Sequence, residues 1–353
     1  MDRVLKVLVV DDSAYVRKVV RQMLSRSPFI EVVGAARDGR EALELVEQLD
    51  PDVVTCDLIM PELDGVGFVR EQMARRPLPI IIMSIASETG ETALTALDAG
   101  AVDFVQKPTA LATEKIFEVS DELIEKVKAA AEIPMARVSA ARPAAEAEAA
   151  GGPPATGDPV ARRELADVVV IGISTGGPQA LKQLIPQLPA DFPAPVAMVM
   201  HMPVGYTEMY ARKLDELSPL EVSEAREGDL LRAGAALLAP AGRHLSFRRR
   251  ADGAVVAHLD SKPFDLPHRP SVDVLFQSAA EVYGQRVLGV VMTGMGSDGR
   301  AGAAWIKAQG GLVYTESEET CVVYGMPSSV VEAGLSDRSV PLGRMALAIR
   351  EAV

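Results

Sequence analysis

The chain has 353 residues, which is enough for two domains of average size. Hydrophobic residues make up 48% of the sequence and charged residues 24%, as in ordinary globular proteins, so we expect a sizeable core. The formal net charge of −13 argues against a general nucleic-acid binder, and only two cysteines exclude a disulfide scaffold or a Cys-rich zinc site.

The negative charge is concentrated in the first third of the chain. Residues 1–125 contain 13 Lys and Arg against 23 Asp and Glu, whereas the remaining residues contain 23 against 26. Acidic chemistry is therefore expected first in this region. No apolar run approaches the length of a membrane span, and the run Val7 to Val10 is too short for a signal peptide, so we expect a cytoplasmic protein.

The first 125 residues alternate short apolar runs with amphipathic stretches. The expected strands are 5–10, 31–35, 53–57, 80–83 and 102–105, and the expected helices are 13–25, 39–48, 65–75, 88–99 and 114–128. Buried strands that alternate with helices predict a parallel sheet covered on both faces, here a flavodoxin-like (βα)5 fold. Ligands of such sheets bind beyond the carboxyl ends of the strands.

Polar residues stand at those carboxyl ends. Asp11 and Asp12 follow the first strand, Asp57 ends the third, Ser84 follows the fourth and Lys107 follows the fifth. Three carboxylates at one edge repel one another and favour a hard cation, with Mg²⁺ expected first. The alternative is that the acids only cap helices, but capping accounts for neither Asp57 nor Lys107.

These residues resemble the receiver domain of bacterial response regulators. The motifs that carry the resemblance are Asp11-Asp12, Asp57, Met60-Pro61, Asp64-Gly65, Ser84 and Lys107-Pro108. The resemblance implies that a histidine kinase phosphorylates Asp57, that Asp11 and Asp12 help Asp57 to hold Mg²⁺, and that Ser84 and Lys107 contact the phosphate. After Ser84 the family often has a second serine and then Leu-Thr, whereas this chain continues with Ile85-Ala86-Ser87. The adjoining loop is therefore expected to pack differently.

The composition changes sharply after this region. Residues 129–163 include thirteen Ala, five Pro and three Gly, and such a segment buries too little apolar surface to offset its ordering entropy. A short helix within 140–150 is the alternative. We predict a receiver domain over 1–125, a flexible Ala/Pro-rich linker over 126–165 and a second domain over 166–353.

Three apolar runs of the second domain, 167–171, 196–200 and 287–292, lead into turns rich in Gly or Pro. We expect a doubly wound, mostly parallel α/β fold, whose sheet edge would gather Ser174, His201 and Asp298. Ser174 lies in a G-x-S-x-G pattern that exposes a nucleophile. A serine needs a base such as His201, and the base needs an acid such as Asp298 to orient it.

Each of these residues has a plainer explanation when taken alone. The serine and the aspartate could cap helices, and His201 could be a core histidine. Of the other histidines, His258 lies in a strand-like alternating run, His244 in a turn and His268 between prolines, so only His201 is expected at the serine's edge. Along the chain these residues come in the order Ser, His, Asp, whereas α/β-hydrolases have the order Ser, Asp or Glu, His. We therefore predict a triad that is not built on the α/β-hydrolase fold.

The segment Gly294-x-Gly296-x-x-Gly299 also matches the fingerprint of dinucleotide-binding proteins. Acidic residues follow about twenty positions later, at Glu316, Glu318 and Glu319. The late position in the domain and the carboxylate of Asp298 beside a pyrophosphate argue against this function. The glycines serve equally well to expose backbone N–H groups to an oxyanion.

The second domain resembles the catalytic domain of chemotaxis protein-glutamate methylesterases, and the whole chain is similar to the CheB family. The motifs are 172–177 (GISTGG), 201–203 (HMP), 270–273 (PSVD), 293–296 (TGMG) and 298–299 (DG). The resemblance implies hydrolysis of glutamate γ-methyl esters on chemoreceptors with release of methanol, and deamidation of receptor glutamines, without a cofactor for this chemistry. It assigns Ser174 as nucleophile, His201 as base, Asp298 as orienting acid, and the Met295 and Thr175 N–H groups as oxyanion donors.

The same resemblance implies that the unphosphorylated receiver covers the catalytic edge until Asp57 is phosphorylated. Two other functions keep the receiver but change the second domain. It could be a nucleotide-binding output module that uses the Gly294 loop, or an adaptor that docks on receptors without catalysis.

Overall fold

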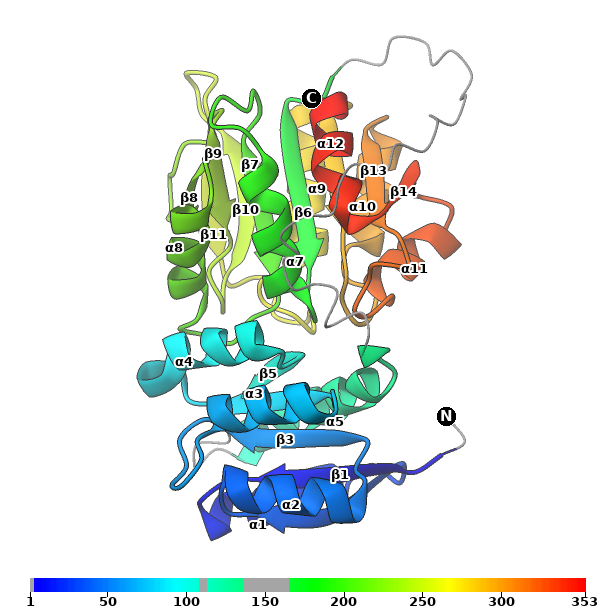
Figure 1. Cartoon of the computed structure of the whole chain (residues 1–353). Helices are drawn as coiled ribbons and strands as arrows, with labels where there is room; N and C mark the ends of the chain where they lie inside the picture. Colours follow the sequence, from blue (N-terminus) through cyan, green and yellow to red (C-terminus); the bar gives the residue numbers. More distant parts are fainter. Residues whose placement is uncertain (1–2, 108–112, 136–164) are drawn as a thin grey trace.

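The computed structural model describes residues 3–107, 113–135 and 165–353. Two α/β units follow one another along the chain, the N-terminal unit at the bottom of Figure 1 and the C-terminal unit at the top. Most of the predicted linker, residues 136–164, lies outside the described residues. The domain boundaries as a whole therefore stay a prediction.

The N-terminal unit contains one parallel sheet with strand order β2-β1-β3-β4-β5. Its strands are β1 (Leu5–Val10), β2 (Ile30–Ala36), β3 (Val53–Asp57), β4 (Ile80–Ser84) and β5 (Asp103–Gln106). Every residue of β3 and β4 is buried, because helices cover both faces of the sheet. The predicted fold class is confirmed.

The helices of this unit are α1 (Ala14–Leu24), α2 (Gly39–Leu49), α3 (Gly65–Arg75), α4 (Ala86–Ala99) and α5 (Thr113–Ala131). Three of them begin after a side chain that accepts a hydrogen bond from the first turn, namely Ser13, Asp38 and Asp64. These caps place the helix starts directly after the strand ends, where the polar residues stand.

Helix α5 corrects the start of the predicted linker. The linker was expected from residue 126, but α5 continues to Ala131. Lys126 is buried in this last part, where its ammonium contacts Asp103 at 3.0 Å, and Val127 and Ala130 pack into a core cluster. Composition missed this end because alanine is common both in linkers and in helices.

The C-terminal unit contains a seven-stranded sheet with order β14-β13-β12-β6-β7-β9-β8, in which every pair is parallel. Its strands are β6 (Val168–Ile173), β7 (Val196–Met200), β8 (Glu221–Glu224), β9 (Ala235–Leu238), β12 (Val287–Val291), β13 (Leu312–Glu316) and β14 (Arg338–Val340). An antiparallel pair, β10 (His244–Arg249) and β11 (Val255–Asp260), stands apart from this sheet. The mostly parallel fold is confirmed.

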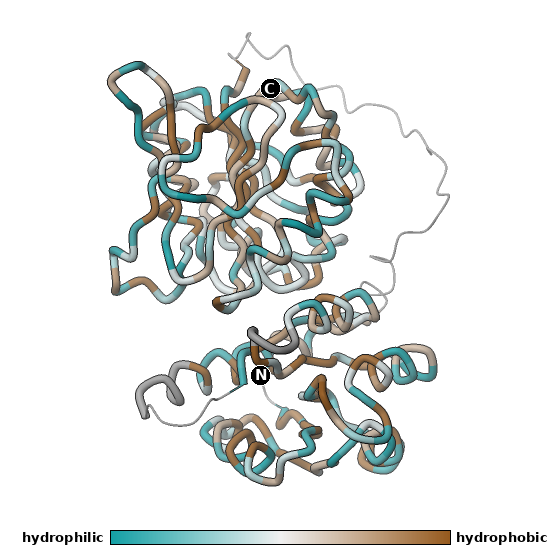
Figure 2. The backbone as a smooth tube through the Cα atoms, turned by 90° about the vertical axis from the view of Figure 1, so that its left-hand side faces the viewer, coloured by the Kyte–Doolittle hydropathy of each residue, from teal (hydrophilic) through white to brown (hydrophobic). Residues whose placement is uncertain are grey.

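Helices cover the C-terminal sheet, and Figure 2 shows apolar residues along its central strands. The helices are α7 (Gly177–Leu184), α8 (Thr207–Leu217), α9 (Val272–Tyr283), α10 (Arg300–Ala308), α11 (Met326–Glu332) and α12 (Leu342–Ala352), with a short 3₁₀ helix η1 (Ile185–Gln187) after α7. None of the described helices is long and apolar enough to span a membrane.

The two units touch where α4 of the first lies against α7 and α8 of the second (Figure 1). Gly90 in α4 is packed so closely that a Cβ atom there would lie 1.9 Å from the terminal carbon of Met209 in α8. The N-terminal unit thus approaches the C-terminal unit from the side on which β6 and β7 end.

Candidate functional site

The edge of the N-terminal sheet gathers the polar residues that the sequence placed there. Asp11, Asp57 and Ser84 are buried, and the ammonium of Lys107 lies 2.9 Å from Asp11 and 2.7 Å from Asp57. Oδ1 of Asp57 also accepts a hydrogen bond from the Leu58 amide at 2.6 Å. Burial raises the pKa of Asp57, although Lys107 acts in the opposite direction.

The donor set of this edge fits a hard divalent cation. One carboxylate oxygen each from Asp11, Asp12 and Asp57 lies within 4.8 Å of the others. Oδ2 of Asp11 is buried and lies 2.9 Å from the Lys107 ammonium, so this oxygen already faces a positive charge. Oxygen ligands of this kind are those that Mg²⁺ prefers.

The serine turn is shaped by glycines at the end of β6. Gly172 faces Val272 so closely that a Cβ atom would lie 2.2 Å from that side chain, and Gly176 has a φ of +80°. Helix α7 then begins at Gly177, with Pro178 in its first turn. Ser174 therefore stands between a buried strand and a helix start, as the G-x-S-x-G pattern predicts.

His201 and Asp298 meet at the same edge. The His201 amide donates to the carbonyl of Ile173, which immediately precedes Ser174, and Nε2 of the His201 ring lies 2.8 Å from Oδ2 of Asp298. Nδ1 of His201 is buried, and none of the residues that the structure describes forms a hydrogen bond with it. The imidazole is thus held through Nε2, and Nδ1 is the ring nitrogen left for another group.

Asp298 is fixed by donors besides His201. Its carboxylate accepts hydrogen bonds from the Ser271 hydroxyl at 2.9 Å and from the Val272 and Asp273 amides at 2.8 and 3.0 Å. Burial acts to raise the pKa of Asp298, but His201 and these amides outweigh it and lower the pKa. The 270–273 motif, to which sequence reasoning gave no role, therefore anchors the acid at the start of α9.

Thr293 links the loop after β12 to the serine turn. Its carbonyl accepts the Ser174 amide at 3.0 Å, and its hydroxyl donates to the Thr175 carbonyl at 2.9 Å. The Gly294 amide donates to the carbonyl of Val323. The backbone amides of Ser174 and Gly294 therefore already donate hydrogen bonds within the protein. The next amide along the chain is that of Thr175 in the serine turn and that of Met295 in the loop after β12.

One histidine that sequence reasoning set aside lies in this site. The ring of His268 stacks on that of His201 with centroids 4.0 Å apart. Burial, followed by the nearby His201, lowers the pKa of His268 to about 4, so this ring is neutral near pH 7. The expectation that His201 is the one histidine at the serine's edge is wrong. His268 lies in the loop between β11 and α9, and this loop brings its ring against that of His201.

His244 is a second correction. It was expected in a turn, but it begins β10 and is buried, and its Nδ1 accepts the Ser271 amide at 3.2 Å. His244 thus holds the backbone of the 270–273 motif, whose residues donate hydrogen bonds to Asp298. Neither this role nor that of His268 has a sequence signal, since both depend on loops that approach from a distant part of the chain.

The N-terminal unit touches the residue that follows Ser174. The Thr175 hydroxyl donates to Oδ2 of Asp103 in β5 at 2.5 Å, and both residues are buried. The other oxygen of Asp103 accepts from the Lys126 ammonium at 3.0 Å, and this ammonium also donates to the Phe104 carbonyl at 2.8 Å. A carboxylate of the N-terminal unit is thus fixed against the serine turn.

A second contact between the units involves Ser84. The Tyr206 hydroxyl donates to Oγ of Ser84 at 2.8 Å, and its ring packs against Phe104 with centroids 4.8 Å apart. Tyr206 is fully buried. The residue expected to contact a phosphate on Asp57 is therefore also bonded to the C-terminal unit.

Ion pairs border this interface. Asp98 of α4 pairs with Lys182 of α7 and with Lys213 of α8, and it also accepts from the Gln179 amide at 3.2 Å. These partners lower the pKa of Asp98 against the effect of burial. Because Lys182 lies on α7, which begins three residues after Ser174, this contact also holds that helix to the N-terminal unit.

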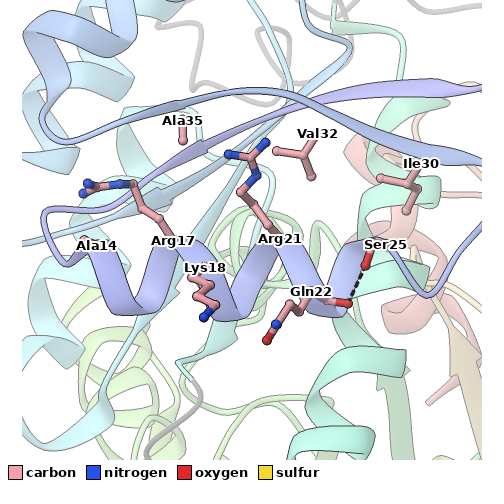
Figure 3. Close-up of a pocket in the computed structure, with 9 residues that line it drawn as sticks. All are labelled: Ala14, Arg17, Lys18, Arg21, Gln22, Ser25, Ile30, Val32 and Ala35. Atoms are coloured by element: carbon pink, nitrogen blue, oxygen red, sulfur yellow. Dashed lines mark hydrogen bonds between the residues drawn. The ribbon is translucent and has the colours of Figure 1, made fainter.

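A groove of about 600 Å³ lies elsewhere, between α1 and β2. Arg17 and Arg21 extend from α1 toward the strand that carries Val32 and Ala35 (Figure 3). Arg17 also donates to the carbonyls of Asp11 and Asp12. The groove contains none of the predicted site residues.

Comparisons with known proteins agree with this architecture. The sequence model for CheB methylesterase matches residues 169–349, and that for the response regulator receiver domain matches residues 7–118. A protein-glutamate methylesterase/protein-glutamine glutaminase of Myxococcus xanthus is 51% identical over 99% of this chain and 98% of its own. A protein of the same name from Pyrococcus horikoshii is 40% identical over 100% and 95%.

A solved structure resembles the C-terminal unit. The CheB methylesterase catalytic domain of Thermotoga maritima is 42% identical and aligns with a TM-score of 0.52, covering 53% of this chain and 99% of that domain. The family models, the full-length relatives and this structure all point to one assignment. The chain belongs to the CheB methylesterase family, and it carries a response regulator receiver domain ahead of the esterase domain.

Proposed function

We propose that the chain hydrolyses γ-methyl esters of glutamate on chemoreceptors, releases methanol, and deamidates receptor glutamines. The observation that carries the proposal is the His201–Asp298 pair with a free Nδ1 at the edge that bears Ser174. Relatives that share its full length are named for both activities.

In the proposed reaction Ser174 is the nucleophile and Nδ1 of His201 is the base. Asp298 accepts a hydrogen bond from Nε2–H and so keeps the proton off Nδ1 before the reaction. Nδ1 takes the hydroxyl proton as the Ser174 oxygen attacks the ester carbonyl. The protonated imidazole then donates this proton to the departing methoxide, which leaves as methanol.

The acyl-enzyme is hydrolysed by the same groups in reverse. Nδ1 removes a proton from water, the resulting hydroxide attacks the acyl carbon, and the Ser174 oxygen leaves with that proton. The glutamate carboxylate is the product, and a glutamine substrate would release ammonia instead of methanol. In both steps the oxyanion accepts hydrogen bonds from the Met295 and Thr175 amides, because those of Ser174 and Gly294 are occupied.

The receiver is proposed to inhibit this reaction until a histidine kinase phosphorylates Asp57. Asp103 and α4 lie against the serine turn and its helix, where they would exclude a protein substrate. A phosphoryl group on Asp57 adds about −1.5 to −2 charges. Ser84 and Lys107 would reorganise around it, and Ser84 would exchange its bond with Tyr206 for one with the phosphate.

Asp11, Asp12 and Asp57 would hold Mg²⁺ during phosphorylation. The bound ion would offset the negative charge of the incoming phosphoryl group. A cytoplasmic location, with chemoreceptors as substrates and a histidine kinase as phosphodonor, completes the proposal.

Methanol release from methylated receptor, measured with and without a small phosphodonor, tests both parts. We expect release that the phosphodonor increases, and cleavage of the chain after Ala150 should raise the basal rate roughly tenfold, a coupling of about 1.4 kcal/mol. A chain that releases no methanol in any state would contradict the proposed activity. An unchanged rate in the isolated fragment 151–353 would contradict inhibition by the receiver.

Two other functions make different predictions. A nucleotide-binding module would take up dinucleotides in equilibrium dialysis, but Glu316, one of the acids that could bind a ribose, is fully buried. A non-catalytic adaptor would not react with a serine-directed phosphonate, whereas the proposed enzyme should be labelled at Ser174.

A further inference from the structure

Glu316, the last residue of β13, is a buried carboxyl that the proposed mechanism does not use. Its exposed fraction is 0%. Oε2 accepts the Thr293 amide at 2.9 Å, and Oε1 accepts the Thr320 hydroxyl at 3.0 Å. Among the residues that the structure describes, no cation forms a salt bridge with it.

Burying a carboxyl without a counter-ion lowers the stability of the folded state. A charged group without a counter-ion is strongly disfavoured in an apolar interior, and burial raises the pKa of Glu316 to about 7. The reason for a carboxyl at this position must therefore lie in the groups that it holds.

The main group that it holds is Thr293. While Glu316 fixes the Thr293 amide, the Thr293 carbonyl accepts the Ser174 amide and the Thr293 hydroxyl donates to the Thr175 carbonyl. A single residue thus joins the buried carboxyl to the serine turn. Thr293 is itself 1% exposed, so its amide would have no solvent partner if the carboxyl were removed.

We propose that Glu316 is a positioning residue for catalysis, which acts through Thr293 to fix the turn that carries Ser174 and the Thr175 amide. This inference rests on the proposed function, in which Ser174 is the nucleophile. Loss of the bond would let the Met292–Thr293 peptide group rotate toward another acceptor, and this would shift the neighbouring Thr293 carbonyl that accepts the Ser174 amide. A displacement of about 1 Å at a reacting group can cost roughly 100-fold in rate.

The contact of the second carboxyl oxygen with Thr320 allows a matched control variant to be designed. The Thr320 hydroxyl also lies 3.4 Å from the Ser317 carbonyl and accepts the Leu342 amide at 3.0 Å. In Glu316→Gln the side-chain carbonyl can still accept the Thr293 amide, while the NH₂ group donates to Thr320, whose proton turns to Ser317. Glu316→Met has similar length but offers no acceptor.

The test compares kcat and KM for methanol release by the full chain, and the rate at which a fluorophosphonate labels Ser174. We expect Glu316→Met to lose at least tenfold in kcat and in labelling rate, with KM within about threefold. Glu316→Gln should stay within about threefold of the parent in all three. A folded Glu316→Met with the parent's kcat, or equal losses in both variants, overturns the proposal.

Thermal unfolding shows whether each variant is folded at the assay temperature. If Glu316→Met is not, Glu316→Asp decides, because its carboxylate is one methylene too short to reach Thr293. It should lose about tenfold in kcat while Glu316→Gln does not, and the parent's kcat in Glu316→Asp overturns the proposal. An active Ser174→Ala would instead refute the proposed function itself, so the two failures are distinguishable.

Discussion

The two sheet edges hold their key aspartates in opposite ways. Asp57 pairs with one lysine side chain and one backbone amide, and burial raises its pKa. Asp298 accepts from His201, a serine hydroxyl and two backbone amides, and its pKa is lowered. A carboxylate surrounded by fixed donors keeps its charge and its place, which suits an orienting acid. Asp57 has fewer donors, a lysine ammonium and a backbone amide, so burial outweighs them and raises its pKa.

The largest expected effect on the rate of methanol release comes from removing the hydroxyl of Ser174. Ser174→Ala should lower methanol release at least 10³-fold, because no other group can form the acyl-enzyme. Ser271→Ala is the matched control, since it removes only one of the donors to Asp298 and should cost less than tenfold. Comparable rates in the two variants would show that Ser174 is not the nucleophile.

The same substitution at the two edges tests the comparison directly. Asp298→Asn should lower the rate about 10² to 10⁴-fold whether or not a phosphodonor is present, since an amide can donate to His201 and favour the wrong tautomer. Asp57→Asn should abolish only the response to the phosphodonor. Both variants are assayed for methanol release in both conditions, and a phosphodonor response that survives in Asp57→Asn would contradict its role.

A smaller effect on the basal rate of methanol release is expected at the Tyr206–Ser84 contact between the two units. Tyr206→Phe removes the bond to Ser84 and should raise the basal rate about two- to fivefold, as loss of one hydrogen bond of about 1 kcal/mol would. Tyr210→Phe is the control, because the Tyr210 hydroxyl donates to Pro178 within its own unit. If the control raises the basal rate as much, the effect does not arise at Ser84.

The last expected effect is on stability rather than on rate, and it concerns Glu316. The unfolded carboxyl ionises near pH 4.5 and the folded one near pH 7, so between these values the folded state binds more protons and loses stability as the pH rises. Glu316→Gln lacks this loss. Its advantage over the parent should grow by about 2 to 4 kcal/mol from pH 4.5 to 7 and then level off.

The single tryptophan makes this measurement specific. Trp305 lies in α10 of the C-terminal unit, so its fluorescence during urea unfolding reports on that unit. Midpoints for the parent and Glu316→Gln are compared at pH 5 and pH 8. A difference between the two proteins that does not change with pH would mean that Glu316 does not titrate in this range.

Periodicity was sufficient for most of the fold. The apolar runs and their glycine turns gave the strands of the first unit to within two residues, because a strand buried on both faces must be apolar throughout. The predicted helix ended at residue 128 and missed the last residues of α5, since the alanines at 129–131 look like linker until their packing in the core is known. The roles of His268 and His244 were missed for the same reason, as their neighbours come from distant loops.

The sequence by itself determined the two parallel sheets and the polar residues at each carboxyl edge, because both follow from local patterns and from the geometry of parallel strands. Only the tertiary structure decided how those residues are used. It pairs His201 with Asp298 through Nε2, sets Asp103 and Ser84 against the second unit, and buries Glu316 beneath the serine turn. These contacts join residues between 23 and 122 positions apart. No local pattern encodes them, since each depends on how whole elements pack.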